Sequence, residues 1–144
     1  MKKLTNDQLA FFLARITIGI NFLIHGVVRI PKLTMFVEHV VQGFKDTYLP
    51  NFIVLPFAYV LPFIELIIGL LLLIGLKTRW AAAAGSLLIA ILIFGTSLQE
   101  DWALVGSQMI YAIFFFILIK NLEHNALALD GKHRTKIHGF STKR

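Results

Sequence analysis

Residues 57–76, FAYVLPFIELIIGLLLLIGL, form an apolar run in which Glu65 is the one charged residue. A helix needs about 20 mostly apolar residues to cross the hydrocarbon core of a bilayer. A carboxylate within that core needs a partner, a proton or a water-filled cavity, because an isolated charge there costs about 3 kcal/mol or more. The run therefore predicts a membrane helix that directs one polar side chain into the protein.

Three more apolar runs lie at residues 9–30, 80–98 and 104–119, and the last extends to residue 122 at the membrane interface. Of the 144 residues 57% are hydrophobic and only 15% are charged, and the mean hydropathy of +0.75 is too high for a soluble domain. Cysteine is absent, which excludes disulfides and thiolate chemistry. We predict an all-α membrane protein, with a bundle of four transmembrane helices in residues 1–122 and a basic cytoplasmic tail in residues 123–144.

The distribution of charge predicts how the four helices are oriented. Only residues 77–79 join the second run to the third, so these two helices form an antiparallel hairpin. An even number of spans places both termini on one side, and that side carries most of the lysine and arginine residues. The loop between the last two helices holds Glu100 and Asp101 and no basic residue. By the positive-inside rule, both termini are cytoplasmic.

Residues 31–50 connect the first two membrane helices and have an amphipathic pattern. Apolar side chains recur every three to four residues on one helical face, at Leu33, Phe36, Val37, Val40, Val41 and Phe44. We predict a helix that lies on the outer membrane surface or covers the outer mouth of the bundle near His25 and Arg29. A disordered loop is the alternative.

Polar residues form a stripe on the first membrane helix, since they follow one another at intervals of four: Thr17, Asn21, His25 and Arg29. Such a stripe faces other helices or water rather than lipid. With antiparallel helices, His25 lies roughly 8 Å and Glu65 roughly 12 Å below the outer surface, so the two side chains reach a similar depth. Arg15 is closer to the cytoplasmic end and approaches Glu65 from below if it turns inward.

We predict that Glu65, His25 and Arg15 form the catalytic part of a buried site, and that further polar residues bind a cofactor, namely Asn21, Arg29, Gln108 and Tyr111. This combination suits a quinone in a proton-linked redox reaction, because its carbonyl oxygens need donors and its ring needs an apolar slot. A structural interpretation stays open, in which the pairing of Glu65 only fixes the register of the helices and the arginines are interface anchors.

Two segments, ARITIGINFLIHGVVRI and IELIIGLLLLIGLKTRWAAAAG, together with the long first loop resemble the DoxX/DoxD-like family of small bacterial membrane proteins. The resemblance covers roughly residues 13–119, and its motif positions are Arg15, Gly19, His25, Gly26, Arg29, Glu65, Gly69, Gly75, Thr78 and Arg79. It implies a multi-pass protein of the bacterial cytoplasmic (inner) membrane. Some relatives resemble a subunit of thiosulfate:quinone oxidoreductase, and others are accessory proteins. Arg29 stands where a lysine is common, and the chain lacks cysteine, so thiosulfate chemistry is not expected from this chain alone.

Two functions stay open at this point. One is an integral membrane subunit of a redox system that interacts with quinone, in which Glu65 and His25 manage protons and Arg15 or Arg29 balances charge. The other is a non-catalytic accessory membrane protein that stabilises or assembles a partner enzyme. A proton-coupled carrier is weaker, because no internal repeat is detectable.

The expected partners are membrane lipids and either another protein or a second copy of the chain. Nucleic acid is not expected, because the basic tail has few aromatic residues for stacking. No metal or haem site is predicted either, since His25 is the one histidine inside a predicted span.

Overall fold

The structure, a computed structural model, describes residues 4–130, which form helices and connections and contain no strand. The elements in chain order are α1 (Asn6–Arg29), η1 (Ile30–Lys32), α2 (Leu33–Gly43), α3 (Asn51–Ile74), α4 (Thr78–Leu98), α5 (Trp102–Lys120) and η2 (Leu122–His124). Four segments are long and apolar enough to cross a membrane, Asn6–Gly43, Asn51–Ile74, Thr78–Leu98 and Trp102–Lys120. The predicted all-α fold with four transmembrane helices is confirmed, and residues 131–144 of the predicted tail lie outside the described residues.

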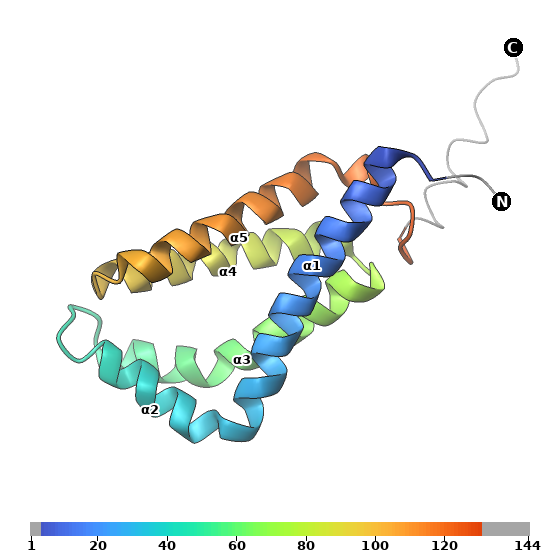
Figure 1. The fold of residues 1–144 in the computed structure, drawn as a ribbon. Coiled ribbons are helices and arrows are strands. Elements are labelled where there is room, and N and C mark those ends of the chain that lie inside the picture. The colour runs from blue at the N-terminus through green and yellow to red at the C-terminus, as the bar shows by residue number, and fades with distance from the viewer. Residues whose placement is uncertain (1–3, 131–144) are drawn as a thin grey trace, which may run out of the picture.

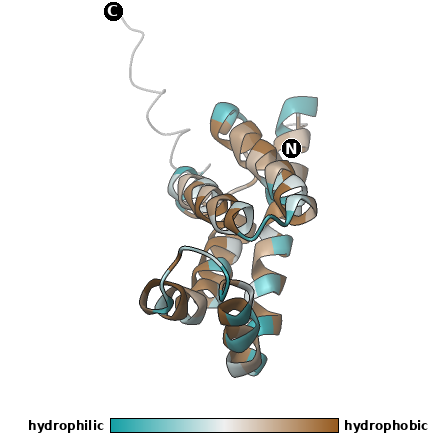
Figure 2. Cartoon of the chain, turned by 90° about the vertical axis from the view of Figure 1, so that its left-hand side faces the viewer, coloured by the Kyte–Doolittle hydropathy of each residue, from teal (hydrophilic) through white to brown (hydrophobic). Residues whose placement is uncertain are grey.

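The helices associate as two pairs, with α1 packed along α3 and α4 packed along α5. The start of α1, the turn between α3 and α4 and the end of α5 share one end of the bundle, here called the tail end (Figure 1). The α2–α3 and α4–α5 connections lie at the opposite, loop end (Figure 1). Hydrophobic residues cover most of the helical ribbon, as expected for helices that face lipid (Figure 2).

Local sequence signals explain where several helices begin and end. Thr5 and Gln8 form a capping box at the start of α1, an arrangement that satisfies two free backbone donors. The Asp101 carboxylate accepts the backbone N–H of Leu104 and so caps α5. Gly75 ends α3 in the left-handed conformation, with φ of +67°, which glycine adopts without steric cost.

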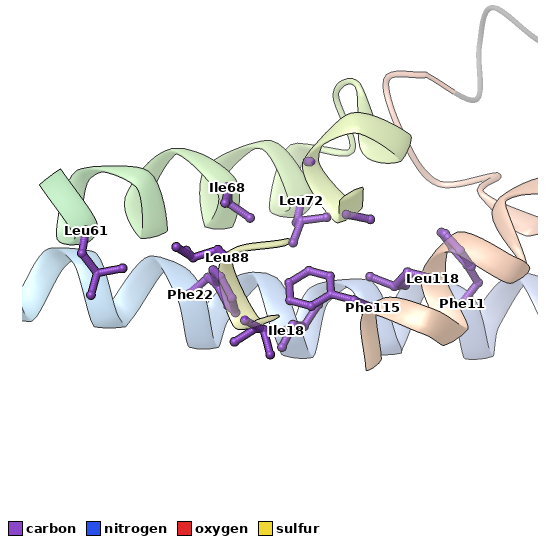
Figure 3. Close-up of a cluster of buried hydrophobic side chains, with 12 residues drawn as sticks. Phe11, Ile18, Phe22, Leu61, Ile68, Leu72, Leu88, Phe115 and Leu118 are labelled. Atoms are coloured by element: carbon purple, nitrogen blue, oxygen red, sulfur yellow. The ribbon is translucent and has the colours of Figure 1, made fainter. Parts of the chain in front are cut away.

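The core consists of apolar side chains from α1, α3, α4 and α5, among them Phe11, Ile18, Phe22, Leu61, Ile68, Leu72, Leu88, Phe115 and Leu118 (Figure 3). Glycines permit the closest helix contacts. A methyl group added to Gly69 of α3 would lie 2.7 Å from the Leu23 Cα of α1, and one added to Gly26 of α1 would lie 2.6 Å from the Pro62 carbonyl of α3. Small residues at these positions bring the two backbones together, which is typical of helix pairs in membranes.

The predicted amphipathic helix is confirmed as α2, and residues 44–50 form turns after it. Pro31 lies in the η1 turn, where its fixed φ and missing N–H favour a break between α1 and α2. The helix α2 buries Val37 and packs on α3 at the loop end. The Arg29 guanidinium lies over the Phe36 ring at 4.7 Å from its centroid, which fixes α2 near the polar end of α1.

At the tail end, residues 125–130 fold back over the α3–α4 turn and are here called the C-terminal strap. The Asp130 carboxylate accepts the backbone N–H groups of Lys77 at 2.9 Å and Thr78 at 2.6 Å. The Asp130 N–H donates to the Gly75 carbonyl at 3.0 Å, and the Asn125 amide donates to the Thr78 hydroxyl at 3.0 Å. The strap thus joins the end of the chain to the α3–α4 turn.

Candidate functional site

Glu65 on α3 is buried, and its partner is Arg29 from the last turn of α1. The Arg29 Nη1 atom donates to both carboxylate oxygens, at 2.6 Å to Oε1 and 2.5 Å to Oε2. The Glu65 side chain is 5% exposed and the Arg29 side chain 28% exposed. This ion pair supplies the partner that a carboxylate in a membrane helix requires.

His25 lies one turn before Arg29 on the same face of α1. Its Nδ1 atom is 3.7 Å from Glu65 Oε1, which is too long for a hydrogen bond but close enough for a charge interaction. The expected proximity of His25 and Glu65 is therefore present. The polar stripe on α1 brings both side chains to the same carboxylate.

Arg15 does not approach Glu65, contrary to the expectation from the sequence. It is 1% exposed and lies at the tail end, where Nη2 donates to the Leu127 carbonyl of the strap at 2.5 Å. A side chain on Gly75 would overlap Arg15 Nη1, so the guanidinium rests on the backbone at the end of α3. The physical reason is distance, since 14 residues of helix separate Arg15 from Arg29, or about 21 Å.

A cavity of about 320 Å³ lies between the two helix pairs and is lined by residues of all five α-helices. The predicted site residues at its wall are Asn21, His25, Arg29, Glu65, Gln108 and Tyr111. Arg15 is the one predicted site residue that does not line it. The structure thus gathers six of the seven predicted residues around one chamber, towards the loop end.

Two further polar pairs line the chamber. The Thr96 hydroxyl of α4 lies 2.8 Å from the Gln108 carboxamide oxygen of α5, and both residues are buried. The Asn21 amide of α1 lies 3.4 Å from the Tyr111 hydroxyl of α5. Most of the remaining wall is apolar, with Phe22, Phe36, Phe57, Leu61, Ile89 and Leu92 among the lining residues. An apolar chamber with a few convergent polar groups is typical of small-molecule sites.

Sequence reasoning missed several cavity residues, including His39 on α2, Thr96 on α4 and Gln99 at the C-cap of α4. His39 follows Phe36 by three residues and therefore shares its helical face. Thr96 and Gln99 are also three apart and are among the polar residues that follow a long apolar stretch of α4. These spacings were the available signals. Among residues 4–130 no group of three or more histidine, cysteine, aspartate or glutamate side chains could hold a metal ion.

A second polar cluster joins Arg15 to the strap but lines no part of the cavity. Burial raises the pKa of the Asp130 carboxyl, but hydrogen bonds from Thr78 and Lys77 and the nearby Arg15 charge together lower it below its ordinary value. The hydrogen bonds favour the ionised form of Asp130 because both backbone N–H groups are donors. The cluster therefore connects α1, the α3–α4 turn and the strap through charge and hydrogen bonds.

In comparisons with known proteins, one family model matches a range that contains most of the residues lining the cavity. The model of the family described as DoxX matches residues 10–97. This range includes His25, Arg29, Glu65 and Thr96, whereas Gln108 and Tyr111 on α5 lie beyond it. A search of curated proteins and a search of solved structures each found no match.

Proposed function

Because the chain belongs to the DoxX family, whose members are generally membrane proteins, we propose that it is an integral membrane subunit of a redox system whose cavity binds a quinone. The observation that carries this proposal is the convergence of the Glu65–Arg29 pair, His25 and Tyr111 on one largely apolar chamber. We propose the cytoplasmic membrane of a bacterium as its location, with both termini in the cytoplasm, because Lys77, Arg79 and Lys120 lie at the tail end and the α4–α5 connection holds no basic residue.

The size and walls of the chamber suit a single substituted ring. Its volume of about 320 Å³ is at the lower end of the range for small-molecule pockets, about 300–1,000 Å³. Phe22 and Phe57 offer aromatic contacts, and Leu61 and Leu92 offer aliphatic ones. A quinone ring with short substituents fits into a cavity of this volume. A quinone with a longer tail needs an opening from the cavity towards the lipid.

The polar groups match what the ring oxygens and the accompanying protons require. The Tyr111 oxygen accepts a hydrogen bond from Asn21, so its own hydrogen is available to a ligand oxygen. Glu65 and His25 are candidates for proton transfer, since both are titratable and 3.7 Å apart. Arg29 balances the charge of Glu65. A quinone supplies a two-electron, two-proton couple when bound.

The test of this proposal combines bound ligand with activity. Protein purified in mild detergent is extracted with organic solvent, and quinone is expected in the extract in near-stoichiometric amount. Glu65→Gln keeps the shape of the side chain and one acceptor for Arg29 but removes the titratable group, so quinone-linked electron transfer in membranes is expected to be lost while the protein stays folded. Glu123→Gln is the matched control, because Glu123 is exposed at the tail end.

A quinone-free extract, or full activity per folded molecule in Glu65→Gln, overturns the redox proposal. The second candidate, an accessory protein without chemistry of its own, is favoured by one observation. Arg29 binds both oxygens of Glu65 and so joins α1 to α3 at the loop end, as a purely structural pair would. In that case Glu65→Gln lowers stability or partner binding, and activity falls only in proportion to the remaining folded protein.

A further inference from the structure

The Thr96 hydroxyl has three oxygen neighbours and only one hydrogen. It lies 2.8 Å from Gln108 Oε1, 2.9 Å from the Leu92 carbonyl and 3.2 Å from the Ile93 carbonyl. A threonine hydroxyl donates once and accepts through its lone pairs. Two of the three contacts therefore bring oxygen against oxygen without a proton between them. Thr96 and Gln108 are both buried, so water does not relieve this conflict in the way it would at a surface.

Rotation of the Gln108 carboxamide by half a turn replaces the shortest of these contacts by a hydrogen bond, and the Thr96 hydrogen is left to the Leu92 and Ile93 carbonyls. The oxygen and nitrogen of a carboxamide have nearly the same shape, so hydrogen-bond partners decide which atom occupies which position. With nitrogen beside Thr96, Gln108 donates to the Thr96 oxygen and Thr96 donates to the Leu92 carbonyl. The Thr96 hydroxyl then donates once and accepts once. The opposite end of the carboxamide, which now carries the oxygen, makes no hydrogen bond within the described residues and is open to the cavity.

We infer that Gln108, held by Thr96, presents an acceptor to the cavity and that the site therefore binds the hydroquinone form of its ligand more tightly than the quinone form. This inference rests on the proposed function. A hydroquinone has two hydroxyl groups that can donate, whereas a quinone has only carbonyl acceptors. A quinone oxygen placed beside Gln108 would face another oxygen and lose a hydrogen bond that the hydroquinone makes.

The other polar groups of the cavity do not reverse this preference. Tyr111 can donate to a carbonyl or accept from a hydroxyl, so it serves both forms. Glu65 accepts from Arg29 at both carboxylate oxygens, and its carboxylate has further lone pairs that accept only from a donor. Donors such as the remaining N–H groups of Arg29 serve both forms, because a hydroxyl oxygen also accepts a hydrogen bond, whereas an acceptor serves only the hydroquinone. One hydrogen bond made by one form alone corresponds to an affinity ratio of about tenfold.

Selective binding of the reduced form has a redox consequence. Tighter binding of hydroquinone than of quinone raises the reduction potential of the bound couple, because binding and reduction are thermodynamically linked. For a two-electron couple, an affinity ratio of about tenfold corresponds to about 30 mV. Thr96 acts here through Gln108 and is a positioning residue, because it need not touch the ligand itself.

The experiment compares the two oxidation states of one short-chain quinone. Dissociation constants for the hydroquinone and the quinone are measured anaerobically on the purified, delipidated full chain by tryptophan fluorescence or calorimetry. Wild-type protein is expected to bind the hydroquinone about tenfold more tightly. Thr96→Val removes the hydroxyl that orients Gln108, so the ratio is expected to fall towards one, and Thr96→Ser is expected to restore it.

Thr17→Val is the matched control. Thr17 makes the same kind of hydroxyl contact to the carbonyl four residues earlier, at 2.8 Å from Leu13, but it does not line the cavity. The ratio of the quinone and hydroquinone dissociation constants of Thr17→Val is expected to equal that of the wild type. Equal or tighter binding of the quinone by wild-type protein overturns the inference and leaves the proposed function intact, as does an unchanged ratio in folded Thr96→Val. Binding of neither form overturns the proposed function together with the inference.

Discussion

Arg29 donates from one nitrogen to both carboxylate oxygens of Glu65, and this contact ties the last turn of α1 to the middle of α3. Most of the pair is shielded from water, since the Glu65 side chain is 5% exposed. Removing one member leaves the other without its counter-charge, whereas removing both leaves only a packing defect. The cost of breaking the pair and the net value of the pair are therefore different quantities.

We predict that Arg29→Met lowers the free energy of unfolding by about 3 kcal/mol, because Glu65 keeps its charge without a partner or must take up a proton. The double variant Arg29→Met/Glu65→Met is expected to recover most of this loss. Denaturation of the wild type, Arg29→Met, Glu65→Met and the double variant in the same detergent measures the coupling energy. Additive losses in the double variant would contradict the interpretation of the two residues as an interacting buried pair.

The close approach of α1 and α3 predicts a strong effect of a single methyl group. Gly69→Ala would place Cβ 2.7 Å from the Leu23 Cα, so the helices must separate, at a cost of about 1–3 kcal/mol. Gly106→Ala on α5 is the control, because a methyl group there meets no atom within 4 Å. Thermal unfolding in detergent is expected to show a clear loss for the first variant and none for the second. Equal midpoints would show that the α1–α3 contact is looser than described.

Asp130 predicts a stability change at acidic pH. Its pKa is lowered in the folded state by the hydrogen bonds from Thr78 and Lys77 and by Arg15, which together outweigh the effect of burial. The contribution of Asp130 to the stability of the folded state is therefore fully present above the unfolded pKa of about 3.9. It is lost as the pH falls through the lower pKa of the folded state. Proteolytic sensitivity of the strap, followed with an acid-active protease, should rise below about pH 4. Asp130→Asn should make the strap sensitive already at neutral pH, and Glu123→Gln should not.

The contacts of Arg15 with the strap predict how well the backbone N–H groups of the strap are protected from exchange with solvent. Arg15→Met removes the hydrogen bond to the Leu127 carbonyl and the charge near Asp130. The backbone N–H groups of Leu129 and Asp130, which donate to Ile74 and Gly75, are expected to exchange with solvent faster by at least about tenfold, as one lost hydrogen bond implies. Hydrogen exchange read by mass spectrometry measures this. Unchanged protection would mean that Asp130 alone anchors the strap.

The sequence predicted the helices and most of the cavity for a simple physical reason. Membrane spans follow from local hydropathy, and the interval of four residues places Asn21, His25 and Arg29 on one face without any knowledge of packing. The choice of partner for Glu65 was harder. The sequence predicted His25 and Arg15 beside Glu65. The register between α1 and α3 instead pairs Glu65 with Arg29, and that register depends on glycine contacts between residues far apart in the chain.

Other parts of the site could not be derived from periodicity. The Thr96–Gln108 pair depends on how α4 and α5 meet across their connection, so the spacing of residues within either helix does not show that these two side chains touch. The strap also lacks a periodic signal, because its contacts are single backbone and side-chain hydrogen bonds to a turn some 50 residues earlier. Contacts of this kind need the tertiary arrangement before they can be recognised.

The C-terminal strap has a consequence for the order in which the protein is made. The ribosome completes α1 long before residue 127 exists, so Arg15 enters the membrane without the Leu127 carbonyl that later accepts its hydrogen bond. Before the strap is synthesised, the long side chain of Arg15 can stay charged only if its guanidinium reaches the aqueous surface. Arg15 can therefore become buried only after the last helix has been inserted. The first helix thus reaches its final position only after translation has ended. A chain truncated just before the strap should therefore keep Arg15 directed towards the aqueous surface.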